Sequence, residues 1–123
     1  MSWTPEQLAL LDGTRELDIA VRRDDGSLRP WTPIWVVRVV GDVYVRTWYR
    51  RDGGWFGLAV KTRRARVRVP GVEVDVRIED VGAAPSALRD DVDAAYRAKY
   101  GGGSTGNMIA DAAAATTLRL HRE

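Results

Sequence analysis

The chain has 123 residues, a formal net charge of +2, 45% hydrophobic and 29% charged residues, which fits one globular domain spanning residues 1–123. It contains no cysteine and a single histidine, His121, which excludes disulfides and a thiolate nucleophile and argues against a histidine-rich metal site or a Ser-His-Asp triad. No stretch approaches the roughly 18 apolar residues of a membrane span, and the N-terminus lacks a signal-peptide pattern, so we expect a cytoplasmic protein.

The first predicted element is a short helix near the N-terminus. Thr4 is typical of an N-cap, Pro5 of the first helical position, and Gln7 completes a capping box. Gly13 is expected to end the helix in a left-handed turn.

Strand patterns follow this helix. Residues 17–22 alternate between apolar and polar side chains, as in a half-buried strand. The Pro30–Pro33 segment bars regular pairing and is expected as a loop or a sheet edge. Two β-rich runs, Ile34–Val40 and Val43–Tyr49, flank Gly41-Asp42, which favours a tight type II′ hairpin.

The middle of the chain contains a short predicted helix, Trp55–Thr62, and then another hairpin. Its strands, Ala65–Val69 and Val72–Asp80, flank Pro70-Gly71, a pair that suits the centre of a type II turn. Every second residue of the later strand is apolar, so one face of that strand is expected in the core.

The C-terminal part is predicted to hold a helix that runs to about Tyr100 with Ser86 as its N-cap. The Gly101–Gly106 run is either a flexible connection or a mobile lid over a ligand, and a last strand covers Thr116–His121. The sum is mainly β with short helices (α+β). Because exposed sheet edges need closure or covering, a small six-stranded β-barrel is the economical architecture.

Basic residues gather in the stretch from Arg38 to Arg68, where nine of them stand against two acidic residues. Such a field concentrates anionic partners, and guanidinium groups match phosphate oxygens. Arg66 and Arg68 share one strand face, and they would converge with Arg46 if their strand paired near residues 43–49. Beside aromatic side chains, this stretch suits a ligand with a phosphate and a flat ring. The alternative is that these arginines lie on strand faces that point into solvent and bind no ligand.

The strand Val43–Tyr49 has two unlike faces. Period-two spacing places Tyr44, Arg46 and Trp48 opposite the valines of this strand. We expect the valines in the core, which leaves the aromatic face for a ligand or a second subunit. The alternative is that Trp48 packs under a neighbouring helix while Arg46 reaches past it to water. Asp93, at the start of the last helix, is expected to interact with the helix dipole.

Several pieces of the chain carry a family resemblance: Pro33–Val39, Val43–Thr47, Gly54-Trp55, Asp93–Gly101 and Ala115–Leu120. Together they resemble a family of small uncharacterised bacterial proteins that is common in actinobacteria. That family resembles, more distantly, the split-barrel flavin-binding proteins, among them pyridoxamine-phosphate oxidase-like proteins and deazaflavin-dependent nitroreductases. The resemblance implies a six-stranded split β-barrel, a homodimer, and FMN or a deazaflavin in a groove between the subunits.

The resemblance also selects residues around the cofactor phosphate, at the end of one strand and around the following short helix. Combined with the basic stretch, it gives the predicted cofactor-binding residues Arg38, Arg46, Thr47, Trp48, Trp55, Lys61 and Arg66. The Ser-Arg/Lys-Lys phosphate motif of the oxidase-like proteins is missing, because residues 51–55 stand in its place. The Asn-Leu and Asn-Pro signatures of the nitroreductase helix are also absent.

Three functions remain open at this point. The first is a flavin or deazaflavin protein, such as a reductase of small organic molecules, in which protein groups position the cofactor ring. The second is a non-catalytic binding protein for an anionic aromatic ligand. The third is nucleic-acid binding by the basic hairpin, which flanking acidic residues disfavour because they limit any continuous basic track. No metal is expected.

Overall fold

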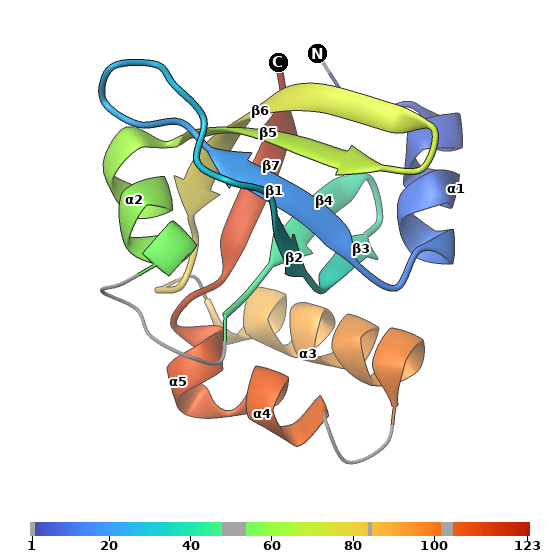
Figure 1. Cartoon of the computed structure of the whole chain (residues 1–123). Coiled ribbons are helices and arrows are strands. Elements are labelled where there is room, and N and C mark those ends of the chain that lie inside the picture. The colour runs from blue at the N-terminus through green and yellow to red at the C-terminus, as the bar shows by residue number, and fades with distance from the viewer. Residues whose placement is uncertain (1, 48–53, 84, 102–104) are drawn as a thin grey trace.

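The computed structural model describes residues 2–47, 54–83, 85–101 and 105–123 (Figure 1). These residues form one antiparallel sheet of seven strands in the order β2-β1-β5-β6-β7-β4-β3, which curls into a nearly closed barrel. The strands are β1 Leu17–Val21, β2 Thr32–Ile34, β3 Val36–Val39, β4 Asp42–Val45, β5 Arg64–Val69, β6 Val72–Asp80 and β7 Leu118–Arg122. The prediction of a mainly β protein with short helices is confirmed.

The predicted number of six strands is wrong, because the run Ile34–Val40 does not form one strand. It breaks at Trp35, so that Ile34 ends β2 and Val36 begins β3. These two strands are the two edges of the sheet, and one residue joins them. The chain therefore passes directly from one edge to the other, which brings the edges close to closure. The expectation of a sheet edge around Pro33 is confirmed, since Pro33 lies in β2.

Five helices accompany the described strands. They are α1 Pro5–Gly13, α2 Gly54–Thr62, α3 Ser86–Tyr100, α4 Thr105–Ile109 and α5 Asp111–Ala114. Figure 1 shows α1 and α2 on opposite sides of the barrel and the last three helices gathered beneath it. No helix in the described ranges combines the length and apolarity needed to cross a membrane.

The beginning of α1 forms as its sequence predicts. The Thr4 amide donates to Gln7 Oε1 at 3.0 Å, and the Gln7 amide donates to Thr4 Oγ1 at 3.2 Å. This reciprocal pair satisfies two of the amide groups that a helix start leaves without partners. The predicted left-handed Gly13 is wrong: Gly13 is not among the glycines with positive φ, and the extended Thr14 (φ −100°, ψ 142°) ends the helix instead.

The two tight hairpins differ in how well the sequence predicts them. Val69 pairs with Val72, and Gly71 has a φ of +93°, so the predicted type II turn at Pro70-Gly71 is confirmed. In the β3–β4 hairpin Val39 pairs with Asp42, which makes Val40 and Gly41 the central residues. The predicted Gly41-Asp42 turn is therefore wrong by one residue. As a result Val40 adopts a positive φ of 55°.

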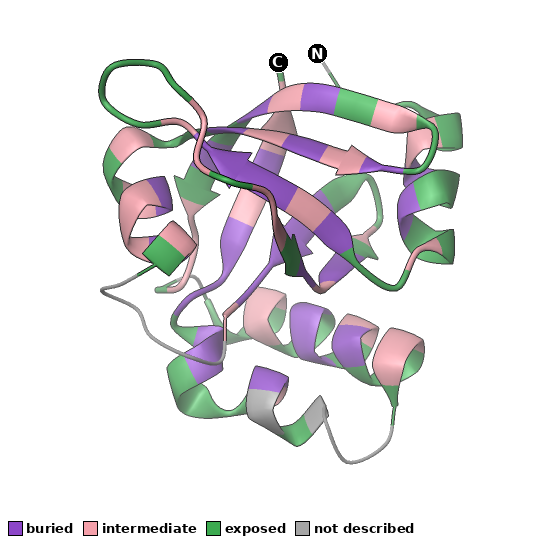
Figure 2. Cartoon of the chain, viewed as in Figure 1, coloured by how far each residue is buried: buried purple, intermediate pink, exposed green. Residues whose placement is uncertain are grey.

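The core has two parts, both drawn in purple in Figure 2. The larger part fills the barrel and includes Val74, Val76 and Ile78, as the alternation in β6 predicts. The smaller part lies between the sheet and α3 and contains Val37, Tyr44, Val92, Tyr96 and Met108. The expectation of an exposed Tyr44 face on β4 is wrong, because α3 and α4 cover that face and bury Tyr44.

Candidate functional site

The arginines of the basic stretch do not converge in the structure. β5, which carries Arg66 and Arg68, pairs with β1 and β6. β4, which leads to Arg46, pairs with β3 and β7. Because β6 and β7 lie between β5 and β4 in the sheet, the predicted meeting of Arg66 and Arg68 with Arg46 is wrong.

Most cations of this stretch have carboxylate partners from other parts of the chain. The contacts of the partly exposed cations are Arg38 Nη2–Asp12 Oδ2 at 2.6 Å, Lys61 Nζ–Asp24 Oδ2 at 3.0 Å, Arg64 Nη2–Glu123 Oε2 at 2.9 Å, Arg66 Nη1–Glu73 Oε2 at 3.3 Å and Arg68 Nε–Asp18 Oδ2 at 3.1 Å. Acidic residues outside the stretch therefore balance much of the charge excess that the sequence shows. For Arg66 and Arg68, the alternative of solvent-facing strand residues fits the structure better.

Of the two tryptophans predicted to bind the cofactor, Trp48 and Trp55, the structure describes only Trp55. Trp55 lies half-buried on α2 and meets the ring of Phe56 edge-on, with centroids 5.7 Å apart. Trp48 lies outside the described residues. The structure therefore places Trp55 near the start of α2, in contact with the barrel core.

Arg46 occupies a buried polar centre where strands and helices meet. Its side chain has an exposed fraction of 0%. The guanidinium Nη1 lies 2.6 Å from Asp93 Oδ1 on α3 and donates to the Met108 carbonyl of α4 at 2.9 Å. Nε donates to Thr117 Oγ1 at 2.8 Å. Arg46 therefore neither reaches water, as in the alternative above, nor lies on an open strand face, because α3 and α4 close over it.

This buried centre has unused hydrogen-bonding capacity. Within the described part of the chain, neither Arg46 Nη2 nor the Tyr96 hydroxyl has a hydrogen-bond partner. The Arg46 guanidinium carbon lies 5.5 Å from the centre of the Tyr96 ring, so the two groups are neighbours. Burial raises the pKa of Tyr96 well above its usual value, which keeps the hydroxyl protonated and able to donate. Buried polar groups are rarely left unpaired, so these two groups mark this centre as unusual within the core.

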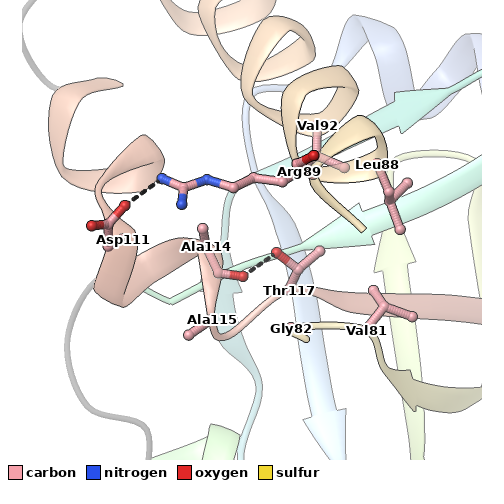
Figure 3. A pocket seen from close by; sticks show the side chains of 10 residues that line it. Val81, Gly82, Leu88, Arg89, Val92, Asp111, Ala114, Ala115 and Thr117 are labelled. Atoms are coloured by element: carbon pink, nitrogen blue, oxygen red, sulfur yellow. Dashed lines mark hydrogen bonds and ion pairs between the residues drawn. The ribbon is translucent and has the colours of Figure 1, made fainter. Parts of the chain in front are cut away.

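A recess with a volume of about 360 Å³ lies beside this centre (Figure 3). Apolar side chains from the loop after β6, from α3 and from α5 form part of its lining, and hydroxyl and charged groups complete it. The lining residues are Val81, Gly82, Ser86, Leu88, Arg89, Val92, Asp111, Ala114, Ala115 and Thr117. Ser86 begins α3 but is not the predicted cap, since Pro85 holds the N-cap position without a side-chain bond.

Arg89 is the cation of this recess. In Figure 3 it reaches from α3 toward Asp111, with Nη2 2.8 Å from Asp111 Oδ1. Its Nε lies 3.6 Å from Asp93 Oδ2, so Arg89 and Arg46 share the Asp93 carboxylate. The hydrogen bond to Asp111, together with the charge of both carboxylates, raises the pKa of Arg89. The Asp111 side chain is 93% exposed, which leaves it free to give way to another anion.

Two of the predicted site residues lie behind the wall of this recess. Thr117, which lines the recess, accepts from Arg46 Nε. The Thr47 amide donates to Thr116 Oγ1 at 3.0 Å, and that hydroxyl donates to the Thr47 carbonyl at 2.9 Å. The structure thus brings Arg46 and Thr47 together at the Thr116-Thr117 segment. Arg38, Lys61 and Arg66 lie on other parts of the surface.

Sequence reasoning missed Arg89, Asp93 and Thr117 as parts of this site. Asp93 was expected to stabilise the helix dipole from the surface, whereas it is buried against Arg46. The i, i+4 spacing of Arg89 and Asp93 is the one local signal that links two of these residues. Nothing in the sequence near Thr117 indicates its contact with Arg46, because 71 positions separate the two residues.

The recess suits one part of a flat ligand that carries polar groups. Its apolar residues can contact a ring, while Arg89 and the Ser86 hydroxyl can contact charged or polar substituents. Its volume of about 360 Å³ is near the lower limit of ligand pockets, which span about 300–1,000 Å³. Among the described residues, no group of three or more His, Cys, Asp or Glu side chains is placed to hold a metal ion.

Several solved structures share this fold, among them the following three. HutZ, described as the heme storage protein of Vibrio cholerae, matches with a TM-score of 0.67 and 13% identity over 100% of this chain and 92% of its own. An FAD-binding protein from Mesorhizobium loti matches with a TM-score of 0.57 and 16% identity over 100% and 92% of the two chains. A protein described as F420 reductase matches with a TM-score of 0.51 and 13% identity over 94% and 91%. At these identities the likeness establishes the fold alone.

The sequence itself matches one bacterial family. A comparison with curated proteins finds no match. Residues 7–120 match a family described as "uncharacterized protein conserved in bacteria (DUF2255)", which agrees with the predicted resemblance. The match covers nearly the whole chain and includes every residue of the recess, so the chain belongs to the DUF2255 family.

Proposed function

We propose that this chain is a split-barrel protein that binds a flavin or a deazaflavin and works as a homodimer. The observation that carries the proposal is that nearly its whole length shares the fold of an FAD-binding protein and an F420 reductase. The recess beside Arg46 supports the proposal, because it combines apolar contact surface with the Arg89 guanidinium and the Ser86 hydroxyl.

The recess accounts for only part of such a cofactor. We assign the anion contact to Arg89, which can exchange the exposed Asp111 carboxylate for a ligand phosphate. Arg46 and Thr47 then act as positioning residues that hold the Thr116-Thr117 wall in place. Because the recess is small, the rest of the cofactor extends beyond it, toward a second subunit.

The remaining predicted cofactor-binding residues have two different roles in this proposal. Trp48 and Trp55 are candidates to wall the cofactor ring. Arg38, Lys61 and Arg66 lie away from the recess, so they reach the ligand only as contributions from a partner subunit. A dimer is therefore part of the proposal, and its mass in solution, with and without cofactor, tests that part.

A bound flavin or deazaflavin supplies hydride transfer, which makes a reductase of small organic molecules the proposed activity. The residues of this chain bind and orient the cofactor. A second candidate is a non-catalytic binding protein, which the match to the heme storage protein HutZ favours. Turnover of a nitro or enone compound with a reduced cofactor distinguishes the reductase from the binding protein.

The test is a titration of the purified protein with FMN, FAD, a deazaflavin and hemin, followed by absorbance and fluorescence. We expect saturable binding of a flavin or the deazaflavin. Arg89→Gln should weaken FMN about tenfold or more while changing riboflavin little, because only FMN carries the phosphate that pairs with a guanidinium. Arg97→Gln, an exposed change on the same helix, is the matched control.

The possible results separate the candidates. Binding of hemin alone would favour the storage candidate. Failure of every flavin and deazaflavin to bind would overturn the proposed function. Equal losses of FMN and riboflavin affinity in Arg89→Gln would remove Arg89 as the phosphate contact.

A further inference from the structure

A second recess lies at the other end of α3, where this helix passes α1 and β3. Its volume is about 290 Å³, and it is lined by Asp12, Val37, Arg38, Ala95, Ala98 and Lys99. The first recess uses the Ser86 end of α3, whereas this one uses the last turns of the helix before Tyr100. The two recesses share no residue.

Lys99 contributes a half-buried charge to this second recess. Its Nζ donates to the Leu11 carbonyl at 2.8 Å and to the Val36 carbonyl at 2.7 Å. None of the ion pairs among the described residues includes Lys99. Burial lowers the pKa of Lys99, which the charge of Asp12 opposes. Carbonyl groups thus stabilise the ammonium, and no carboxylate of the described residues pairs with it directly.

Arg38 provides a second cation to the same recess. Its Nε and Nη2 donate to Asp12 Oδ2 at 2.9 and 2.6 Å, and its Nη1 donates to the Val40 carbonyl at 3.0 Å. Asp12 is the one carboxylate among the described lining residues, so two positive charges face one negative charge. The recess therefore has an excess positive charge that one anion would balance.

The two cations also retain N–H groups for a ligand. An ammonium has three N–H groups, of which the two carbonyl contacts of Lys99 use two. A guanidinium has five, and the three contacts of Arg38 leave two of them. Both side chains can therefore donate to an oxyanion without giving up their present partners. The remaining lining residues, Val37, Ala95 and Ala98, are small and apolar and offer no competing acceptor side chain.

We propose that this recess is a binding site for an oxyanion group, a phosphate or a carboxylate, held by Lys99 and Arg38. The site takes either a free small anion or the anionic end of a larger molecule. This site shares no residue with the first recess. Arg38 is also among the residues proposed to reach the cofactor of a partner subunit, so the tests below use protein without added cofactor. Charge-assisted hydrogen bonds from two cations, one of them half-buried, make it stronger than a contact with an exposed arginine.

The chain offers a direct test, because it contains two lysines and the second serves as an internal reference. Lys61 is exposed and pairs with Asp24 on the surface. In protein labelled with ¹³C and ¹⁵N at lysine, each Cε–Nζ pair gives its own NMR signal. Inorganic phosphate and, separately, acetate are added at constant ionic strength, with chloride as the reference salt.

We expect the Lys99 signal to shift saturably with at least one of the two anions while the Lys61 signal shifts little. Saturation by phosphate alone identifies a phosphate site, and saturation by acetate alone or by both anions identifies a site for carboxylates as well. An unchanged Lys99 signal would overturn the proposal. Parallel, non-saturating shifts of both lysines would overturn it too, since they indicate general screening.

A variant tests the second cation. Arg38→Gln should weaken the anion about tenfold, because it removes a charge-assisted contact. Arg68→Gln is the matched control, since Arg68 is also a strand arginine paired with one aspartate. Lys99→Gln also removes two carbonyl contacts of the fold, so the NMR signal of unaltered Lys99 remains the primary readout. Equal affinities of Arg38→Gln and the wild type would contradict the two-cation site.

Discussion

Arg46 and Asp93 form an ion pair with 2.6 Å between Nη1 and Oδ1, and their side chains have exposed fractions of only 0% and 10%. The pair joins the strand end after β4 to α3, 47 positions later in the chain. Arg46 also donates to Met108 of α4 and to Thr117 before β7. One buried guanidinium thus connects the barrel with the helices beneath it, and through Thr117 it supports the wall of the first recess.

Removing this guanidinium should strongly destabilise the fold. In Arg46→Met the buried Asp93 carboxylate keeps, among the described residues, only its longer contact with Arg89, at 3.6 Å. Breaking a buried ion pair lowers the free energy of unfolding by roughly 3–5 kcal/mol. Arg66→Met is the control, because Arg66 pairs with Glu73 and Asp75 at 3.3 Å on the surface, where a pair contributes about 1 kcal/mol or less. Urea unfolding measures both free energies. Equal losses in the two variants would show that Arg46 is not a structural centre.

Local features of this fold can be predicted from sequence, because the interacting residues are close along the chain. The Thr4–Gln7 capping box and the Pro70-Gly71 turn each depend on a few consecutive residues. The alternation in β6 likewise reports directly which of its side chains enter the core.

The first recess and the buried centre at Arg46 depend on contacts between residues that are distant in sequence, so local patterns did not predict their arrangement. Counting charges between Arg38 and Arg68 suggested an anion site, but Asp12 and Asp18 meet these arginines from 26 and 50 positions away. The strand face of Arg46 was expected to be open to a ligand or a second subunit, but α3 packs on it, and the packing of α3 is not visible in the local pattern of that strand. The break between β2 and β3 at Trp35 also coincides with a contact that is distant in sequence. The Trp35 ring stacks on the Tyr100 ring, with the ring centroids 4.0 Å apart, and β-propensity does not reveal this contact.

The β3–β4 turn offers a site for stabilisation. Val40 has a φ of 55° and is 87% exposed, so its conformation is unfavourable and its side chain contributes little packing. A left-handed conformation costs an L-residue about 1–2 kcal/mol, and glycine avoids this cost while losing about 0.5–1 kcal/mol in chain entropy. Val40→Gly should therefore stabilise the protein by up to about 1.5 kcal/mol in urea unfolding.

Val72→Gly is the matched control for this prediction. Val72 also adjoins a tight turn, but it lies in β6 without a positive φ and packs against the core. This change should destabilise the protein by about 0.5–1 kcal/mol or more. Loss of stability in Val40→Gly would contradict the assigned turn register.

Gly82 allows the loop after β6 to approach the segment before β7. A Cβ atom at this position would overlap the Ala115 carbonyl oxygen. Gly82→Ala should therefore cost about 1–3 kcal/mol and displace the Ala115–Thr117 side of the first recess. Gly13→Ala is the control, since a Cβ atom there meets nothing within 4 Å. Denaturant unfolding of both variants checks the prediction, and similar stabilities would refute the close approach.

Glu79 should make stability depend on pH in the acidic range. Its Oε1 lies 2.8 Å from His121 Nε2 and 3.3 Å from Arg119 Nη1. The hydrogen bond with His121, followed by the charge of Arg119, lowers the pKa of Glu79 below its usual value of 4.5. The unfolded state then binds more protons than the folded state just below pH 4.5, so stability falls as pH decreases through the lowered pKa.

The Glu79→Gln variant isolates this contribution. At neutral pH it should be less stable than the wild type by about 1 kcal/mol at most, because the Glu79 side chain is 47% exposed and the pair is screened by solvent. The difference should shrink as pH falls below 4.5, where the carboxylate of the wild type also becomes neutral. Glu73→Gln, on the same strand, controls for the loss of one negative charge. Urea unfolding between neutral pH and pH 3 (about the lowest value before general acid unfolding) measures the difference, and a gap that stays constant or widens toward acid would contradict the assignment.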